Sequence, residues 1–288
     1  MIKNKCKKTV STMLLMTMIV TTCNTNVFAG GEFSCVKVDI HCESVFKDCC
    51  SESYDSLNNE GQKSNSTYTN KSNTATVENG HIIVGKEIEN KKIKDIVSIP
   101  EDKIKSVTFK NGVTSIGFKA FDGCKNLKEV NIPYSVIFIG NSSFYGCKNL
   151  KEVTIPYSIT SIGSCAFSGC TSLKEITIPN NITSIGQFAF EGCKGLKSIT
   201  IPNITKIDEW TFANCTGLTS VIIPNSVTEI SQGAFKGCKS LTSITIGNGV
   251  KYLDKGAFYG CSGLKEVTIP KELDITGIFN EHVKINRI

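Results

Sequence analysis

The chain has 288 residues and a formal net charge of +6, from 32 Lys and Arg against 26 Asp and Glu. Four of the lysines and none of the acids lie in residues 1–29, so the rest carries 28 basic and 26 acidic residues, a net +2. Only one arginine, Arg287, is present, whereas nucleic-acid binding favours clustered arginines for phosphates and base edges. The composition therefore disfavours a nucleic-acid partner.

Residues 1–29 have the three parts of a secretory signal peptide. Lysines at positions 3–8 form a basic region, residues 9–20 are apolar, and a small-residue cleavage site ends at Ala29. The apolar run is shorter than the roughly 20 residues of a membrane-spanning helix. We therefore expect cleavage after Ala29, no transmembrane segment in the mature chain, and a secreted or cell-surface protein. An alternative is a lipid anchor on Cys23, although Thr22 and Val20 fit a lipobox poorly.

Residues 30–50 form a cysteine-rich segment with no obvious core. In an exported chain, clustered cysteines favour disulfides or covalent links between chains. Metal binding with His41 is less favoured because no Cys-x-x-Cys pair is present, and an unpaired segment is the third alternative. We predict no metal site and no cofactor, and the disulfide candidates are Cys35, Cys42, Cys49 and Cys50.

Residues 51–80 are predicted to be a flexible linker. Ser, Asn and Thr fill 16 of the 30 positions, so too few apolar side chains are available to offset the entropy of ordering. Apolar residues return from His81, where residues 81–84 predict a strand and residues 93–99 a capping element. We expect one repeat domain over 81–288, with an N-terminal cap and partial repeat at 81–117, repeats at 118–270, and a C-terminal cap at 271–288.

Seven cysteines mark a sequence repeat, at intervals of 23, 23, 23, 22, 23 and 23 residues: Cys124, Cys147, Cys170, Cys193, Cys215, Cys238 and Cys261. A fixed period of this size predicts a solenoid, in which each repeat forms one coil stacked on its neighbours. Within a unit, Ile176 and Ile178 alternate with polar residues, as in a strand with one buried face, and Pro179 ends that strand. A phenylalanine three residues before each cysteine predicts a stacked aromatic spine.

The unit at residues 166–179, AFSGCTSLKEITIP, resembles the BspA-type leucine-rich repeat of bacterial surface and secreted proteins. The resemblance covers roughly residues 104–270. It implies a β-rich solenoid with about seven repeats plus caps, a right-handed coil or horseshoe with a parallel β-sheet on its concave face. It also implies extracellular binding, including binding of host matrix or plasma proteins. Three departures should bend a coil only locally: one residue missing near Asn203, Asn214 in place of Gly, and Gly247 in place of Pro.

The repeat cysteines are interpreted as structural free thiols. Equivalent cysteines on stacked coils would have parallel Cβ directions about 4.8 Å apart, which is unfavourable for a disulfide. A buried cysteine in a repeated position behaves as a small apolar residue.

Outward positions of the main strand form columns that are the first binding candidates. The same columns are also expected on a sheet face that only contacts solvent and binds nothing. On such a face Thr favours the strand conformation, and neighbouring lysines offset the repulsion between glutamates. The candidate residues are Glu129, Glu152 and Glu175 in one column and Thr154, Thr177 and Thr200 in the next.

Aromatic residues that interrupt the repeat are the second group of candidates. Tyr134 and Tyr157 follow a proline in adjacent coils and should stack on each other, with Phe138 nearby. Phe188 and Trp210 share the position two before the spine phenylalanine. Exposed aromatic clusters are typical of binding hot spots, although a structural plug over the convex edge of the coil is equally compatible with all of these aromatic residues.

No catalytic motif is found. The three histidines lie outside the repeats, and the repeated acids show no special pair. We therefore expect a non-enzymatic binding protein whose partner is a protein, including a host extracellular protein, or a glycan. The alternative is an assembly protein, a covalent oligomer joined through the N-terminal cysteines with the repeats as spacer.

Overall fold

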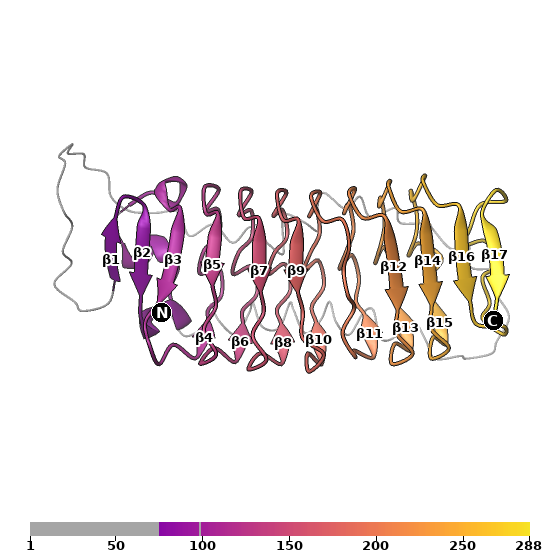
Figure 1. Cartoon of the computed structure of the whole chain (residues 1–288), viewed down its shortest axis with the longest axis horizontal. Helices are drawn as coiled ribbons and strands as arrows, with labels where there is room; N and C mark the ends of the chain where they lie inside the picture. The colour runs from indigo at the N-terminus through magenta and orange to yellow at the C-terminus, as the bar shows by residue number, and fades with distance from the viewer. Residues whose placement is uncertain (1–74, 98) are drawn as a thin grey trace, which may run out of the picture. The chain divides into compact units, whose positions relative to one another are not determined.

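The computed structural model describes residues 75–97 and 99–288. They form a parallel β-solenoid of about eight turns with little helix, in which successive coils lie side by side in chain order (Figure 1). The predicted fold class is confirmed. Helix is confined, within the described residues, to three short elements near the N-terminal end: η2 (Lys86–Glu89), α3 (Ile93–Ile96) and η3 (Glu101–Lys103).

The main strand of each coil alternates buried and exposed residues, as the Val/Ile pattern predicts. Strands of successive coils pair in parallel with equivalent residues opposite each other, so that Val153 faces Ile176 and Thr154 faces Thr177. The main strands form two sheets. The first contains β1 (Ala75–Glu78), β2 (His81–Val84), β3 (Ser106–Phe109), β5 (Glu129–Asn131), β7 (Glu152–Thr154) and β9 (Glu175–Thr177). The second contains β12 (Ser220–Ile223), β14 (Ser243–Ile246), β16 (Glu266–Ile269) and β17 (Lys284–Arg287).

A two-residue strand follows on a second side of each coil. These strands also pair in parallel and again fall into two sheets. One consists of β4 (Ser115–Ile116), β6 (Phe138–Ile139), β8 (Ser161–Ile162) and β10 (Ser184–Ile185). The other consists of β11 (Lys206–Ile207), β13 (Glu229–Ile230) and β15 (Tyr252–Leu253).

The third side of each coil contains the aromatic spine. Rings of the repeat phenylalanines from Phe121 to Phe258 stack at centroid separations of 5.3–5.6 Å with planes 2–15° apart. Backbone N–H groups here bond to carbonyls of the next coil, as from Phe144 to Ala166 at 2.8 Å. The stack buries ring area that a single coil could not, so each coil depends on its neighbours for stability.

The repeat with the missing residue interrupts both strand ladders. No strand is assigned over residues 198–205, and the sheets end at β9 and β10 on one side and resume at β11 and β12 on the other. In the preceding coil Ile182 N–H bonds to Pro179 O across a four-residue turn, whereas Ile204 N–H bonds to Pro202 O across three residues. The deletion therefore tightens one turn. On the side with the aromatic spine, hydrogen bonding between coils continues through this coil, with Phe190 N–H bonded to Thr211 O at 2.9 Å.

Both ends of the stack carry additional elements. At the N-terminal end β1 pairs antiparallel with β2, so residues predicted to be linker up to position 80 are already a strand at Ala75–Glu78. The adjacent β-branched residues Thr76 and Val77 favour a strand, but the polar residues around them led to the linker prediction. At the C-terminal end β17 pairs with β16, and Phe279 extends the spine by packing on Phe258 at 5.5 Å.

Candidate functional site

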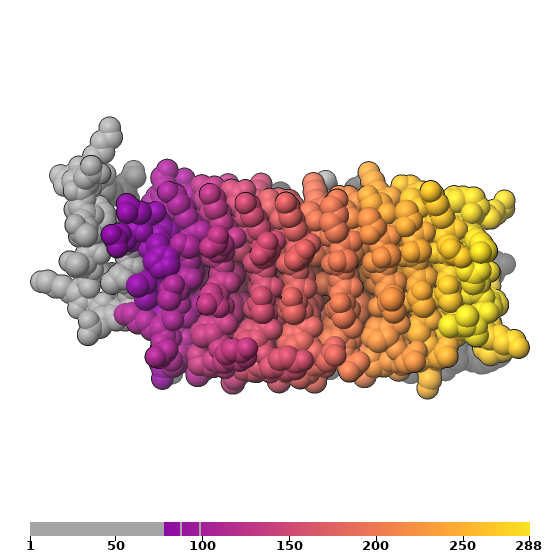
Figure 2. Space-filling view, in the orientation of Figure 1, coloured from indigo at the N-terminus to yellow at the C-terminus, as the bar shows by residue number. Residues whose placement is uncertain are grey.

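An open groove of about 520 Å³ crosses the C-terminal ends of β5, β7 and β9. One outward residue from each of four successive coils lines it: Asn131, Thr154, Thr177 and Thr200. Because equivalent residues are stacked, the groove runs along the stack and across the strands. Figure 2 shows successive coils as adjoining ribs in the orientation of Figure 1.

Two tyrosines border this groove, and their backbones are fixed by turns. Tyr134 and Tyr157 occupy the second position of turns closed by Val136 N–H to Pro133 O and Ile159 N–H to Pro156 O, each at 3.0 Å. The second turn is held further by Asn181 Nδ2, which donates to Tyr157 O at 2.7 Å. The tyrosine side chains are 79% and 68% exposed. The turns thus present two rings to solvent on a rigid base.

The tyrosine rings do not stack on each other, contrary to our expectation. Among the described residues, the rings of Tyr134 and Tyr157 make no contact with each other, although both residues line the same groove. The spine rings stack because the interior confines them, whereas nothing confines these exposed side chains. Both tyrosine side chains are consequently open to solvent at the groove.

The lining of the groove is polar but uncharged. Asn131, Thr154, Thr177, Thr200 and Asn180 supply hydroxyl and amide groups, and Ile155, Ile178 and the prolines supply an apolar floor. No carboxylate, histidine or cysteine is among its described lining residues. The predicted column of Glu129, Glu152 and Glu175 is exposed and in register, but it lies two residues earlier on the same strands and only borders the groove. Phe138, 41% exposed, lies in β6 on the second side of the coil and is not a lining residue.

Phe188 and Trp210 do not form an exposed binding patch. Phe188 is buried, at 5% exposure, and its ring stacks on that of Trp210 at 6.1 Å. A Cβ at Gly233 would lie 2.8 Å from the Trp210 ring, and Lys236 Nζ is 4.6 Å from the ring centroid. Both faces of the indole are therefore covered. The packing of Phe188 and Trp210 therefore agrees with a structural plug at the edge of the coil rather than with a binding patch.

The same position has a left-handed backbone in five coils, with φ between 55° and 60°: Lys119, Ser142, Cys165, Phe188 and Trp210. This conformation is uncommon for non-glycine residues and is unusual for bulky ones. The next two coils have glycine at this position: Gly233 is left-handed, at φ 65°, and Gly256 is not. Sequence reasoning missed this column because its residues share no side-chain type.

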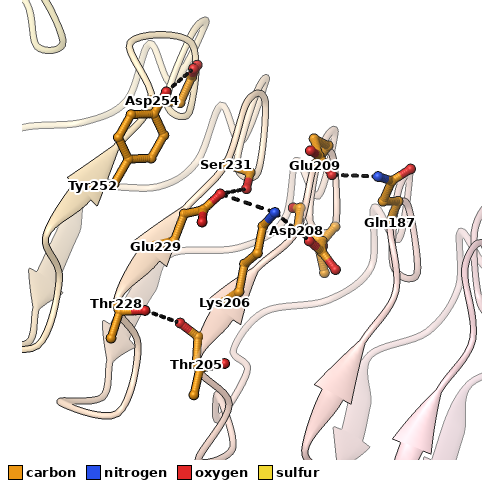
Figure 3. Close-up of polar contacts among 11 residues, drawn as sticks. Gln187, Thr205, Lys206, Asp208, Glu209, Thr228, Glu229, Ser231, Tyr252 and Asp254 are labelled. Carbon is orange, nitrogen blue, oxygen red and sulfur yellow. Dashed lines mark hydrogen bonds and ion pairs between the residues drawn. The ribbon is translucent and has the colours of Figure 1, made fainter. Parts of the chain in front are cut away.

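A group of ionic and polar side chains lies on the second side of the coils after the interruption (Figure 3). Lys206 Nζ lies 3.2 Å from Asp208 Oδ1 and 3.1 Å from Glu229 Oε1. Burial lowers the pKa of Lys206, but hydrogen bonds to these two acids outweigh it and raise the pKa. Burial raises the pKa of Asp208 more than the Lys206 ammonium lowers it. Because these side chains are 30–39% exposed, such pairs contribute about 0–1 kcal/mol each. We regard them as a brace between β11 and β13.

The repeat cysteines are confirmed as buried free thiols. Each from Cys147 to Cys261 donates its S–H to the carbonyl of the spine phenylalanine one coil earlier, at 3.1–3.3 Å. Burial raises the pKa of Cys147 and Cys193 well above the usual thiol range, so these groups are poor nucleophiles and metal ligands. Within residues 75–97 and 99–288 no group of three or more His, Cys, Asp or Glu is arranged to hold a metal ion.

Three predictions lie outside the described residues: the signal peptide at 1–29, the cysteine cluster at 35–50 and the linker over 51–74. All three stay predictions. In the described part of the chain, no helix has the length and apolar character to span a membrane.

Short parallel strands, an inward Leu/Ile/Phe pattern and one coil per repeat define a leucine-rich repeat protein. A model of the BspA-type leucine-rich repeat region, in six copies, matches residues 91–218 and 187–287. The chain belongs to this BspA-type leucine-rich repeat family.

Solved structures similar to this chain include two bacterial leucine-rich repeat proteins, each 29% identical. The one from Bacteroides ovatus aligns over 65% of this chain and 61% of its own, with a TM-score of 0.43. The one from T. pallidum aligns over 72% and 78%, with a TM-score of 0.46. The pneumococcal vaccine antigen PcpA is 17% identical over 76% of each chain, with a TM-score of 0.42. This chain thus matches less than two thirds of the Bacteroides protein. No curated protein matches it.

Proposed function

We propose that this chain is an exported, non-catalytic binding protein that holds an extracellular macromolecule in the groove over β5, β7 and β9. The observation that carries the proposal is the position of Tyr134 and Tyr157. Both are unneeded by the core, exposed, fixed by backbone turns, and placed at a groove that also contains the threonine column. Exposed aromatics on an already fixed backbone lose only side-chain entropy on binding and are typical anchors.

A binding role is also favoured over catalysis by the composition of the groove. General acid–base or nucleophilic chemistry needs a titratable group within hydrogen-bond reach of the substrate. The described lining offers amides, hydroxyls and tyrosine phenols, without a carboxylate, histidine or thiol. Such a surface suits recognition of a long partner across several coils.

The experiment is a binding screen of the full chain against immobilised extracellular matrix proteins, plasma proteins and polysaccharides. Wild type is compared with a Tyr134→Ala, Tyr157→Ala double variant. Tyr259→Ala is the matched control, since Tyr259 is 70% exposed but does not line the groove. We expect loss of the captured partner only in the double variant. Capture that is equal in all three proteins would show that binding does not use this groove.

A further inference from the structure

We propose that the groove accepts a neutral polysaccharide of β-1,4-linked hexoses with all-equatorial substituents, lying along the stack with one sugar per coil. This inference rests on the proposed function of the groove and adds the chemical class of its ligand. Four observations carry it: the direction of the groove, its repeat distance, its lack of charge, and the open faces of its tyrosines.

The direction of the groove and its repeat distance favour a polymeric ligand whose own repeat matches the spacing of the coils. The groove crosses four coils, and the main strands beneath it pair in parallel, which sets successive coils about 4.8 Å apart. An extended β-1,4-linked hexose chain advances by a similar distance per sugar. Each sugar then meets an outward Asn or Thr, and in the first three coils also the residue after the proline.

An extended peptide fits this geometry less well. A peptide advances about 3.3 Å per residue, so its side chains would lose register with the coils within two residues. Peptides that bind sheets by main-chain pairing lie parallel to the strands at a sheet edge. The groove instead crosses the strands where neighbouring main chains are already paired.

The lack of charge in the groove selects a neutral ligand. Amide and hydroxyl groups of Asn131, Thr154, Thr177 and Thr200 can both donate and accept hydrogen bonds, which complements sugar hydroxyls. A polyanion would meet no cation among the described lining residues and would pass close to Glu129, Glu152 and Glu175.

The tyrosines select sugars with flat apolar faces. Each phenol ring has an exposed face, because Tyr134 and Tyr157 do not stack on each other within the described part of the chain. In a hexose whose substituents are all equatorial, both ring faces present C–H groups. Successive sugars of a β-1,4 chain face opposite ways, so only a sugar with two apolar faces can stack on tyrosines in adjacent coils.

The test measures binding of cello-oligosaccharides by the full-length protein with isothermal calorimetry. We expect affinity to rise with length up to about four sugars, one for each coil that lines the groove, and then to level off. Maltohexaose, whose α-linked chain curves, should bind at least about tenfold more weakly than cellohexaose. Changing salt from about 0.05 to about 0.5 M should leave the affinity unchanged, because screening acts only on charged contacts.

The double variant Tyr134→Ala, Tyr157→Ala should lose at least about tenfold in affinity for cellohexaose, and Tyr259→Ala should bind as wild type does. Asn180 lines the groove at the equivalent position one coil further. Asn180→Tyr adds a third ring and should raise affinity for the longer oligosaccharides by a fewfold. A loss in the double variant together with a gain in Asn180→Tyr cannot come from misfolding.

Three outcomes overturn the inference. They are no binding of cellohexaose by wild type, binding of cellohexaose by the double variant that equals wild type, and binding of maltohexaose that equals or exceeds that of cellohexaose. If the screen meanwhile finds a protein or a charged polymer whose capture requires the two tyrosines, the proposed function stands and only the ligand class falls.

Discussion

The thiol of Cys170 donates a hydrogen bond to the backbone carbonyl of Phe144, one coil earlier in the stack, at 3.2 Å. The same carbonyl accepts the N–H of Cys147 at 3.2 Å, so both of its lone pairs are used. Cysteine in this position therefore joins coils as well as filling space. Serine would place a more polar and shorter donor there, and alanine would leave the carbonyl with one partner.

Replacing one of these central cysteines should destabilise the stack. Cys170→Ala removes the inter-coil hydrogen bond and leaves a small cavity, and we expect the free energy of unfolding to fall by about 2 kcal/mol. The measurement is urea denaturation followed by circular dichroism. Lys174→Ala, an exposed change in the same coil, should remain within about 0.5 kcal/mol of wild type. Equal stabilities for the two variants would contradict the role given to the thiol.

Thiol reactivity should be unequal along the cysteine column. Burial raises the pKa of Cys147 and Cys193, whereas a hydrogen bond with Cys238 lowers the pKa of Cys261. Cys261 is also 7% exposed, while Cys147 and Cys193 are fully buried. With iodoacetamide at pH 8 we expect Cys261 to be alkylated first and the central cysteines only on unfolding. Peptide mass spectrometry at several times measures the order, and early labelling of Cys193 would refute it.

Restoring the missing residue should restore the strand ladders. Inserting one asparagine after Asn203 recreates the Pro-Asn-Asn-Ile turn that closes between Pro179 and Ile182 in the preceding coil. We expect new inter-coil hydrogen bonds and a gain of about 1–2 kcal/mol in unfolding free energy. Hydrogen exchange should slow over residues 198–201. The same insertion after Asn225, where the turn is already complete, is the control and should destabilise the protein.

The C-terminal strand should loosen in acid. Hydrogen bonds from Asn286 and Lys284 to Glu266 lower the pKa of this carboxyl below its usual 4.5. A lowered folded-state pKa gives stability that is present above the unfolded-state value and is lost as pH falls through the folded-state value. Hydrogen exchange of β17 should therefore accelerate as pH falls below about 4.5, after correction for intrinsic rates. Glu266→Gln should make β17 insensitive to pH in this range; an unchanged profile would exclude Glu266 as the cause.

The sequence predicts the stack well because the repeat is long and regular. The cysteine interval sets the coil, the Val/Ile alternation sets the main strand, and the phenylalanine column sets the spine. Asn214 was expected to bend its coil only locally. It adopts φ 57° where the other coils have glycine, and its side chain donates to Glu191 at 3.0 Å. Asparagine accepts this left-handed conformation more readily than most residues.

Features that depend on packing between coils were harder to predict. Phe188 and Trp210 differ from the consensus in the same way that Tyr134 and Tyr157 do, yet one pair is covered and the other is open. The difference comes from backbone direction, because the left-handed position turns the first pair onto the neighbouring coil while the proline turns hold the second pair outward. The extension of the spine by Phe279 was also missed, since the last segment breaks the 23-residue interval.

The central claim is that a ligand covers the tyrosines of the groove, and protection from chemical modification tests it most directly. Full-length protein is nitrated with tetranitromethane with and without saturating cellohexaose, and each tyrosine is quantified by peptide mass spectrometry. We predict that cellohexaose slows nitration of Tyr134 and Tyr157 and leaves Tyr259 unchanged. Nitration of Tyr134 and Tyr157 at the same rate with and without the sugar would contradict the account.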